Sequence, residues 1–245
     1  MVASANTETA SSSPSPPVTH IIFDSDGLLV DTEPAYTEAN DQVLRKHGSR
    51  FTMQLKAGMM GRKQRESVEW ILEQVNLAGK VTVDEYIADY DVVLEELFGK
   101  APACRGAEAL VRALKKKGIP MAICSGSSSK DFPPKAANHR SWIDLIDFFV
   151  LTGDDPQVKR GKPFPDGFLE TMKRFPVPPT SPSNVLVLED APNGVKAALA
   201  AGMRCVQVPD PHPAFQVDEE TRKKITVLTS LEEFKPTDFG LPLLD

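Results

Sequence analysis

Two pairs of acidic residues carry the clearest chemical potential in this sequence. Asp24 and Asp26 are separated by one residue where the apolar run "HIIFD" ends, and Glu189 with Asp190 ends the run "NVLVLEDA". A third run, "FFVLTGDD", also ends in acids. Carboxylates this close repel one another and cost free energy to bury. We therefore expect a cation and a chemical role at the ends of these runs.

A hydroxyl group and a lysine belong to the same set. Ser125 and Gly126 end the run "IPMAICSG", and Lys162 lies in "GKPFPDGF". Mg²⁺ prefers carboxylate oxygens and usually shares its shell with substrate phosphate. Asp24 and Asp190 can hold such an ion together with a backbone carbonyl. The phosphate would lie between the ion, Lys162, Ser125 and free N–H groups, and Gly126 would let the backbone approach it.

The first two aspartates can take different roles. Asp24, at the end of the apolar run, is placed to attack phosphorus and form an aspartyl-phosphate, which splits the hydrolysis into two steps. Asp26 can protonate the leaving alcohol and then deprotonate the water that releases phosphate. Simpler interpretations stay open: the pair could form a helix-capping turn, Ser125 an ordinary turn, and Lys162 part of the solvated surface.

Alternating apolar and amphipathic segments predict the scaffold for these residues. We predict strands over residues 20–24, 119–126, 148–155, 184–191, 203–208 and 225–228. Helices are predicted over 106–118, with Gly118 as a left-handed cap, and between Pro192 and Gly202. This alternation indicates an α/β fold with a Rossmann-like parallel sheet and helices on both faces. Ligands of such sheets bind outside the carboxyl ends of the strands, where the acids stand.

Residues 35–100 interrupt the alternation. Amphipathic helices are predicted there over 35–48, 65–76 and 83–99, with no convincing strand between them. We interpret this block as an all-helical cap domain inserted over the carboxyl edge of the sheet. Residues 18–34 and 101–245 then form the core. Residues 1–17, rich in Ser, Thr and Pro, are predicted to be a disordered tail.

Composition excludes several classes of function. The 245 residues carry a net charge of −6, so no basic face is expected for nucleic acid or anionic membranes. No apolar run reaches the length of a membrane span. Cys104, Cys124 and Cys205 lack a metal-ligand spacing and indicate reduced thiols in a cytoplasmic protein. The tail has no apolar secretory segment and no Arg, although a transit peptide stays an alternative.

Four motifs carry a resemblance to a known superfamily. "FDSDGLLVDTE", "CSGSS", "GKPFPDGF" and "LVLEDAPNGVKAALAAGM" resemble, in order and spacing, the motifs of the haloacid dehalogenase-like (HAD) superfamily of Mg²⁺-dependent phosphatases. The resemblance extends over nearly all of residues 18–245, and the insertion matches the subgroup with a helical cap. "LKAGMMGRK", "GDDPQVKRGKP" and "SLEEFKPTDFGLP" are similar to plant-type glycerol-3-phosphatases and eukaryotic pseudouridine-5′-phosphatases.

The resemblance implies a role for each residue of the set. It implies that Glu189 lies at or near the metal, either as a direct ligand or as a supporting group. The other implied roles are Asp24 as nucleophile and metal ligand, Asp26 as acid–base group and backbone carbonyl ligand, Asp190 as metal ligand, and Ser125 and Lys162 as phosphate ligands.

Residues near the cap are candidates for substrate choice. Glu33 follows the first motif and would lie at the hinge to the cap. Gly61, Arg62 and Lys63, in "MMGRK", interrupt the cap helices and could reach the substrate or form a simple loop. Ser25 departs from the apolar residue common in relatives. Its side chain should point away from the flanking aspartates, since strand side chains alternate faces, at a small cost in stability.

We expect a Mg²⁺-dependent phosphomonoesterase that acts on a small phosphorylated metabolite, with glycerol 3-phosphate as the leading substrate. Pseudouridine 5′-phosphate is the main alternative, followed by a sugar phosphate or a phosphomutase reaction. A haloacid dehalogenase is disfavoured because it needs neither Mg²⁺ nor an acid at position 26. A silent binding protein would be free to lose the acids and Lys162, and all are present. A monomer is expected, since the cap already shields the site.

Overall fold

A six-stranded parallel sheet forms the scaffold of the protein. The structure, a computed structural model, describes residues 16–59 and 64–244. The strands stand in the order β3-β2-β1-β4-β5-β6, and every neighbouring pair is parallel. Their bounds are β1 His20–Phe23, β2 Met121–Ser125, β3 Phe148–Leu151, β4 Val185–Glu189, β5 Arg204–Gln207 and β6 Thr226–Val227.

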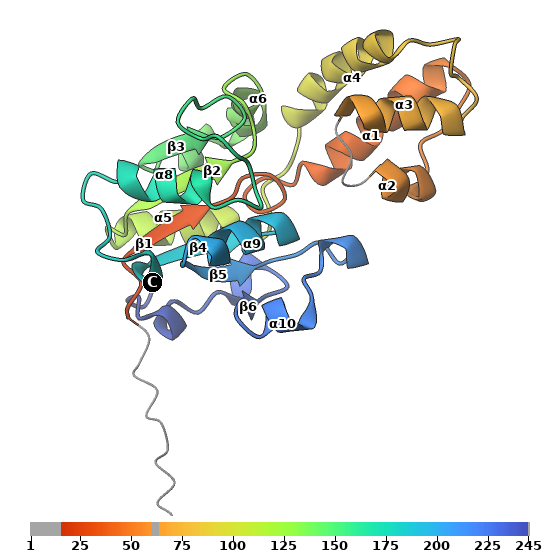
Figure 1. The fold of residues 1–245 in the computed structure, drawn as a ribbon. Coiled ribbons are helices and arrows are strands. Elements are labelled where there is room, and N and C mark those ends of the chain that lie inside the picture. The colour runs from red at the N-terminus through yellow and green to blue at the C-terminus, as the bar shows by residue number, and fades with distance from the viewer. Residues whose placement is uncertain (1–15, 60–63, 245) are drawn as a thin grey trace, which may run out of the picture.

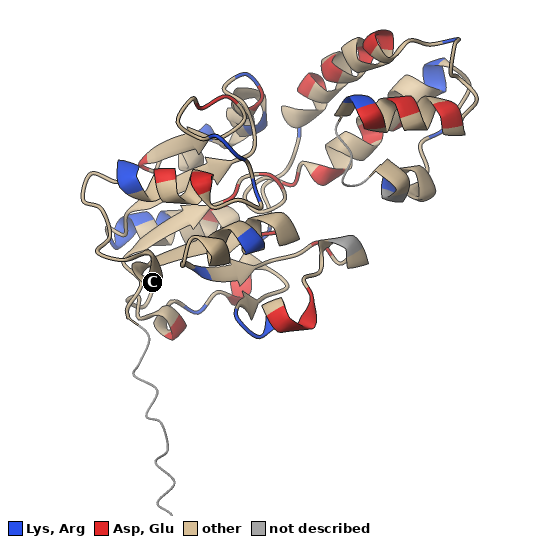
Figure 2. Ribbon diagram, in the orientation of Figure 1, with Lys and Arg blue, Asp and Glu red and all other residues tan. Residues whose placement is uncertain are grey.

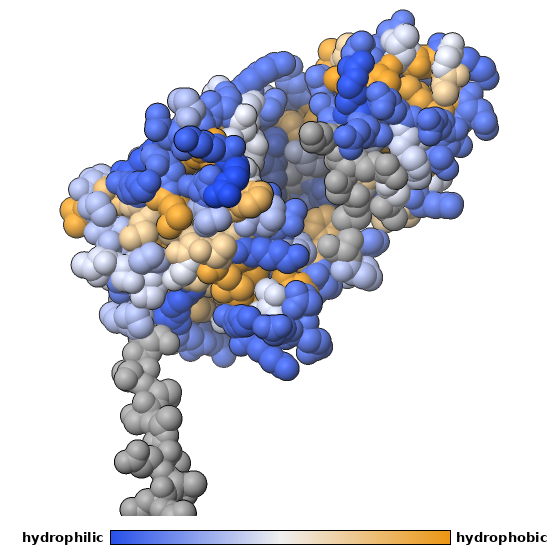
Figure 3. Space-filling view, in the orientation of Figure 1, coloured by the Kyte–Doolittle hydropathy of each residue, from blue (hydrophilic) through white to orange (hydrophobic). Residues whose placement is uncertain are grey.

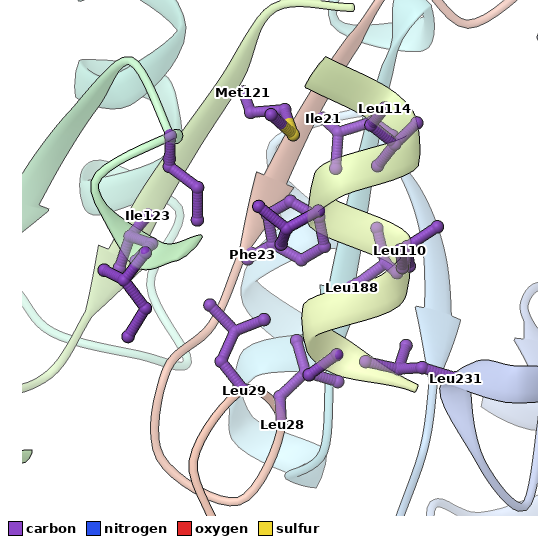
Figure 4. Packing of buried hydrophobic residues seen from close by; sticks show 14 of the residues in the cluster. Ile21, Phe23, Leu28, Leu29, Leu110, Leu114, Met121, Ile123, Leu188 and Leu231 are labelled. Carbon is purple, nitrogen blue, oxygen red and sulfur yellow. The ribbon is translucent and has the colours of Figure 1, made fainter. Parts of the chain in front are cut away.

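Helices cover both faces of this sheet (Figure 1). On one face α5 (Ala107–Lys116) packs Leu110 and Leu114 against Ile21 and Phe23 of β1 (Figure 4). On the other face α8 (Asp166–Arg174) and α9 (Pro192–Ala200) enclose Ile22 in a second apolar cluster. Because both faces are buried, the central strands are apolar throughout instead of alternating with polar residues. The predicted α/β fold with a parallel sheet is confirmed.

All six predicted strands are present, each shorter than its predicted range. Gly118 follows α5 at φ +68°, the left-handed conformation expected of a glycine after a helix. Several short elements were not predicted, because so few residues give little periodic signal. They are α6 Phe132–Ala136, α7 Arg140–Ile143, α8, α10 Glu219–Arg222 and the 3₁₀ turns Ala137–His139, Pro182–Asn184, Pro213–Phe215, Leu231–Glu233 and Pro236–Phe239.

Of the five helices described between β1 and β2 in the chain, the first four stand together away from the sheet (Figure 1). They are α1 Glu33–Lys46, α2 Met53–Met59, α3 Gln64–Gln74 and α4 Val83–Phe98. The three helices predicted there are present, and α2 was missed. These helices bury apolar clusters of their own, separate from those of the sheet. In α4, acidic residues occur without any lysine or arginine (Figure 2).

The predicted domain boundaries stay predictions, with two observations that bear on them. Helix α1 begins at Glu33, before the predicted start of the cap at residue 35. Most of the predicted tail lies outside the described residues, but the carbonyl of Pro17 accepts a hydrogen bond of 2.9 Å from the Asn184 side chain. Within the described ranges, none of the helices combines the length and apolar character that a bilayer crossing requires.

Ser25 gives a stability prediction. Its side chain is fully buried, and its hydroxyl has no hydrogen-bond partner among the described residues. Removing the hydroxyl in Ser25→Ala removes an uncompensated desolvation cost, so the free energy of unfolding should rise by about 1 kcal/mol. Denaturant unfolding of the two proteins measures this difference.

Ser230→Ala is a matched control of opposite sign. The Ser230 hydroxyl is also buried, but it accepts a 3.1 Å hydrogen bond from the Glu232 backbone N–H. Its removal should lower the free energy of unfolding by about 1 kcal/mol. Destabilisation of similar size in both variants would contradict the interpretation of Ser25.

Candidate active site

Three carboxylates meet where β1 and β4 end. Asp24 follows β1, Glu189 ends β4 and Asp190 follows it, and the two strands are parallel neighbours. One oxygen of each carboxylate lies within 4.8 Å of the others, and all three residues are buried. The pairing of these strands therefore brings together acids that are about 165 positions apart in the chain, which is what the sequence predicted of a parallel sheet.

Lys162 partly neutralises this cluster. Its Nζ lies 2.5 Å from Asp24 Oδ1 and 2.5 Å from Glu189 Oε1. Glu189 Oε2 also accepts hydrogen bonds of 3.1 Å from the backbone N–H groups of Asp190 and Ala191. Both oxygens of Glu189 are thus held by donors of the protein. This arrangement fixes Glu189 firmly between the lysine and the start of α9.

Burial and repulsion dominate the electrostatics of the cluster. Burial, with a smaller contribution from Glu189 and Asp26, raises the pKa of Asp24 to about 7 despite the opposing Lys162. Burial and the neighbouring Glu189 raise the pKa of Asp190 well above its ordinary value. Burial alone would lower the pKa of Lys162, but the Asp24 and Glu189 carboxylates outweigh it and raise that pKa. One ammonium group therefore leaves negative charge that it cannot neutralise.

Two glycines let the backbone approach these acids. A Cβ atom on Gly27 would lie 2.4 Å from Asp190 Oδ2, and Gly27 has a φ of +81°. A Cβ atom on Gly194, in α9, would lie 1.8 Å from Glu189 Oε1. Side chains at these positions would occupy the space that the carboxylates now fill. Both glycines belong to the motifs that the sequence indicated, although neither was singled out.

Asp26 lies in a different environment. Its Oδ1 accepts a hydrogen bond of 3.0 Å from Thr32 and lies 2.7 Å from Lys135 Nζ. Its Oδ2 accepts hydrogen bonds of 3.0 Å from Ser127 and 3.4 Å from Ser125. The Asp26 side chain keeps a quarter of its surface exposed, whereas that of Asp24 keeps 8%. Donors surround this carboxylate, in contrast to the crowded acids around Asp24.

The predicted phosphate-binding residues lie beside these acids. Ser125 Oγ is buried and accepts a 3.1 Å hydrogen bond from the Ser127 N–H. Gly126 is exposed and lines the cleft above the acids, and a Cβ atom there would meet nothing within 4 Å. Lys162 also lines this cleft. The three residues predicted to bind phosphate thus lie close together beside the acids, and their binding of phosphate stays a prediction.

A cleft of about 810 Å³ lies between the sheet and the four cap helices, and it is visible as a hollow in Figure 3. The acids form part of its lining from the core, and α1, α2, α3 and α4 supply the opposite wall. Glu33 lines the cleft and pairs with Lys56 of α2 at 2.9 Å. The other predicted cap residues, Gly61, Arg62 and Lys63, lie outside the described residues.

Four further residues around the site were missed in the sequence. Ser127 carried a usable signal, because it stands two residues after Ser125 in the same motif. Thr32 and Lys56 also lie in motifs that the sequence indicated, "FDSDGLLVDTE" and "LKAGMMGRK". Lys135 carried no such signal, because its ion-pair partner Asp26 is distant in the chain. Neither periodicity nor spacing encodes such pairings.

The cluster fits a hard divalent cation. Three buried carboxylates with a single ammonium group form the oxygen-rich, negatively charged donor set that Mg²⁺ prefers. Asp24 and Asp190 would hold the ion, with Glu189 beside them. Such an ion would favour the charged forms of carboxylates whose pKa values burial has raised.

Comparisons with known proteins show similarity to one family of hydrolases. The family model of the haloacid dehalogenase-like hydrolases matches residues 18–202. "(DL)-glycerol-3-phosphatase 1, mitochondrial" of Arabidopsis thaliana is 41% identical, over 92% of this chain and 74% of the relative. "Probable pseudouridine-5'-phosphatase" of Drosophila melanogaster is 39% identical, over 92% of this chain and 95% of the relative.

A solved structure supports the fold alone. The HAD family hydrolase of Deinococcus radiodurans R1, with bound phosphate and sodium, has a TM-score of 0.72 at 23% identity. The alignment covers 89% of this chain and 93% of that one. This chain belongs to the haloacid dehalogenase-like hydrolases. The predictions of the superfamily and of an enzyme of its phosphatase branch are thereby confirmed.

Gly194→Ala tests the geometry around Glu189. The added Cβ would overlap Glu189 Oε1 and displace a carboxylate that Lys162 and two N–H groups hold. A displacement of this kind should lower kcat/KM for p-nitrophenyl phosphate by about 10²-fold. Steady-state kinetics measures the loss, and thermal unfolding shows that the variant is folded.

Gly99→Ala is the matched control. Gly99 follows α4 at an ordinary helical φ of −61°, and a Cβ there would approach nothing closer than Glu96 O at 3.6 Å. Its kcat/KM should stay at the wild-type value. Full activity of Gly194→Ala would show that the position of Glu189 is unimportant.

Mg²⁺ should stabilise the protein more at pH 8 than at pH 5.5. The pKa of Asp24 is raised to about 7 in the folded protein. Without a cation, the free energy of unfolding should therefore fall as the pH rises from about 4 through 7. A cation binds the ionised carboxylates and competes with protons, so its effect grows with pH. At about 100 times its Kd, the ion should add about 2.7 kcal/mol. Melting temperatures with Mg²⁺ and with chelator measure this.

Two variants sharpen that measurement. Asp190→Asn removes a carboxylate of the cluster and should reduce the shift caused by Mg²⁺. Asp154→Asn removes an exposed acid that instead accepts hydrogen bonds from Ser129, so its shift should match the wild type. An equal Mg²⁺ shift at both pH values in the wild type would contradict binding at this cluster.

Proposed function

We propose that this protein is a Mg²⁺-dependent phosphomonoesterase that works through an aspartyl-phosphate on Asp24. The observation that carries the proposal is the buried group of Asp24, Glu189 and Asp190 with Lys162, which lines a cleft large enough for a small metabolite. An ordinary structural ion pair would not need three carboxylates for one lysine. A bound cation and a phosphate dianion give each charged group a partner.

The reaction divides between the two aspartates. An Asp24 oxygen forms a bond to phosphorus as the bond from phosphorus to the ester oxygen breaks, and Asp26 in its acid form gives its proton to that oxygen. Water then attacks phosphorus, the bond to Asp24 breaks, and Asp26 takes the proton of the water. Lys162 neutralises charge on the phosphoryl oxygens, and Ser125 with the backbone at Gly126 orients them. Mg²⁺ would add charge neutralisation and alignment at the phosphoryl group.

Glycerol 3-phosphate is the substrate we propose, with pseudouridine 5′-phosphate as the second candidate. The relative named as a glycerol-3-phosphatase is 41% identical to this chain, and the one named as a probable pseudouridine-5′-phosphatase is 39% identical. Among the described cap residues that line the cleft, the cation is Lys56, which already pairs with Glu33, while Asp91 adds negative charge. Such a wall suits an uncharged alcohol better than a second phosphate group. It therefore favours a phosphomonoesterase over a phosphomutase, and sugar phosphates stay third.

We also propose a cytoplasmic location and a monomeric state for the enzyme. The three cysteines form no disulfide, and two of them are buried. Free thiols of this kind support a location in the reducing cytoplasm. The name of one relative places that protein in mitochondria. We propose a monomer, because the cap helices already cover the cleft. The net charge of −6 supports neither nucleic acid nor anionic membranes as partners.

Phosphate release from a panel of esters tests this function. With Mg²⁺, the wild-type protein should release phosphate from glycerol 3-phosphate with a higher kcat/KM than from pseudouridine 5′-phosphate or sugar phosphates. Asp24→Asn should lower the rate by at least about 10³-fold because it lacks the nucleophile. Chelator or Ca²⁺ should also suppress release, since the larger, looser shell of Ca²⁺ spoils the in-line geometry.

A different result would contradict each part of the proposal. Full turnover by Asp24→Asn would remove Asp24 as nucleophile, and full turnover in chelator would remove the metal. A preference for pseudouridine 5′-phosphate would replace the proposed substrate and keep the mechanism. A requirement for a bisphosphate primer before any phosphate is released would establish a phosphomutase instead.

A further inference from the structure

Lys135 is a buried lysine that the reaction described above does not use. It lies in α6 and is 3% exposed. Its Nζ lies 2.7 Å from Asp26 Oδ1 and donates hydrogen bonds of 2.9 Å to Ser127 Oγ and 3.2 Å to Tyr36 Oη. A buried ammonium group is costly unless it is paired and hydrogen-bonded, so these contacts account for its presence.

Two aromatic rings of the cap helices complete the surroundings of Lys135. Its Nζ lies 4.6 Å from the ring centroid of Phe98 and 5.7 Å from that of Tyr36. The two rings pack edge to face, with centroids 5.3 Å apart. Tyr36 belongs to α1 and Phe98 to α4, so the lysine joins the core to the first and last cap helices. Cation–π attraction in this desolvated place adds to the ion pair.

The contacts of Lys135 argue against direct phosphate binding. An ammonium group has three N–H donors, and Asp26, Ser127 and Tyr36 offer three acceptors within 3.2 Å. No donor is left over for a substrate oxygen while these contacts last. Lys162, by contrast, lies among the acids that surround the expected site of the phosphate.

The contacts form a closed ring around the Asp26 carboxylate. Lys135 holds Oδ1, Ser127 donates to Oδ2, and Lys135 donates to that same Ser127 hydroxyl. A carboxylate held at both oxygens by groups that are also bonded to each other cannot rotate freely about its terminal bond. The ring thereby sets the direction in which Asp26 can give or accept a proton.

We propose that Lys135 is a positioning residue for proton transfer by Asp26. The inference rests on the proposed function, in which Asp26 protonates the leaving alcohol and later deprotonates water. Lys135 touches neither the substrate nor the reacting atoms. It holds the carboxylate at the angle that both proton transfers require, and Tyr36 and Phe98 hold Lys135.

The need for a proton depends on the leaving group, which gives a specific test. Glycerol leaves as a strongly basic alkoxide and needs the proton, whereas p-nitrophenolate leaves without one. In Lys135→Met, kcat/KM for glycerol 3-phosphate should fall by at least about tenfold, part of the roughly 10²–10⁴-fold that general acid–base catalysis supplies. For p-nitrophenyl phosphate, kcat/KM should change by less than about threefold. This ratio reports only the steps up to release of the phenolate, which need no proton from Asp26.

The second half-reaction gives an independent readout. Release of phosphate from Asp24 needs Asp26 as base for either ester, so kcat for p-nitrophenyl phosphate should fall in Lys135→Met and KM should fall with it. A purely structural role would lower kcat/KM for both esters alike. Lys130→Met, at an exposed lysine five positions earlier, is the matched control and should keep wild-type values for both esters.

Further measurements keep the outcomes distinct. Circular dichroism shows whether Lys135→Met is folded. If it is not, Lys135→Gln, whose uncharged side chain costs less to bury than an ammonium group, should show the same contrast between the esters. Equal losses on both esters, or none, would overturn the proposal. If the wild type hydrolyses neither ester, the proposed function fails, and crystal structures of the wild type and the Lys135 variant then test the positioning by themselves. An Asp26 side chain that is shifted, or split between two conformations, in the variant supports the positioning role of Lys135. An unchanged Asp26 side chain overturns that role.

Discussion

The mutual repulsion of three buried carboxylates is the constraint on which the rest of this site depends. Asp24, Glu189 and Asp190 share a space of a few ångströms with the single ammonium group of Lys162. Burial and repulsion raise the pKa of Asp24 and Asp190, so the site costs folding free energy. The apolar contacts on both faces of β1 and β4 provide the stability that offsets this cost. The rigid sheet is thus a condition for the charge cluster, because a softer scaffold would let the acids move apart.

The sheet also explains how two aspartates separated by a single residue acquire opposite surroundings. Asp24 directly follows the strand and faces the acids of β4. Two residues later the chain has entered the turn at Gly27, whose positive φ redirects the backbone. Asp26 is therefore turned toward the hydroxyl and ammonium donors of the loop after β2 and of α6. Chemistry that needs one carboxylate to attack and another to move a proton can be built from neighbours only if the backbone separates their environments in this way.

The parts of the site that sequence could predict lie at the ends of strands or in motifs that resemble those of a known family. Asp24 and Glu189 were predictable because strand ends in a parallel sheet share one edge, and Lys162 because its motif is ordered with the others. The same rule also marked the acids that follow β3, yet Asp155 pairs with Arg174 and Asp154 accepts hydrogen bonds from the Ser129 loop. Lys135 was missed because Asp26 and Tyr36, two of its partners, lie far away along the chain, in the first motif and in α1. Such pairings arise only when separate elements pack together.

The cap explains why the sequence indicates the class of reaction more directly than the identity of the substrate. The groups that we propose to react stand at the carboxyl edge of the sheet, whereas the opposite wall of the cleft comes from α1, α2, α3 and α4. Those helices have apolar clusters of their own, so side chains on their cleft face can change without disturbing the acids. Substrate choice can therefore vary independently of the mechanism, except where Tyr36 and Phe98 meet Lys135. At that contact a change in the cap would also reach Asp26, the carboxylate to which we assign proton transfer.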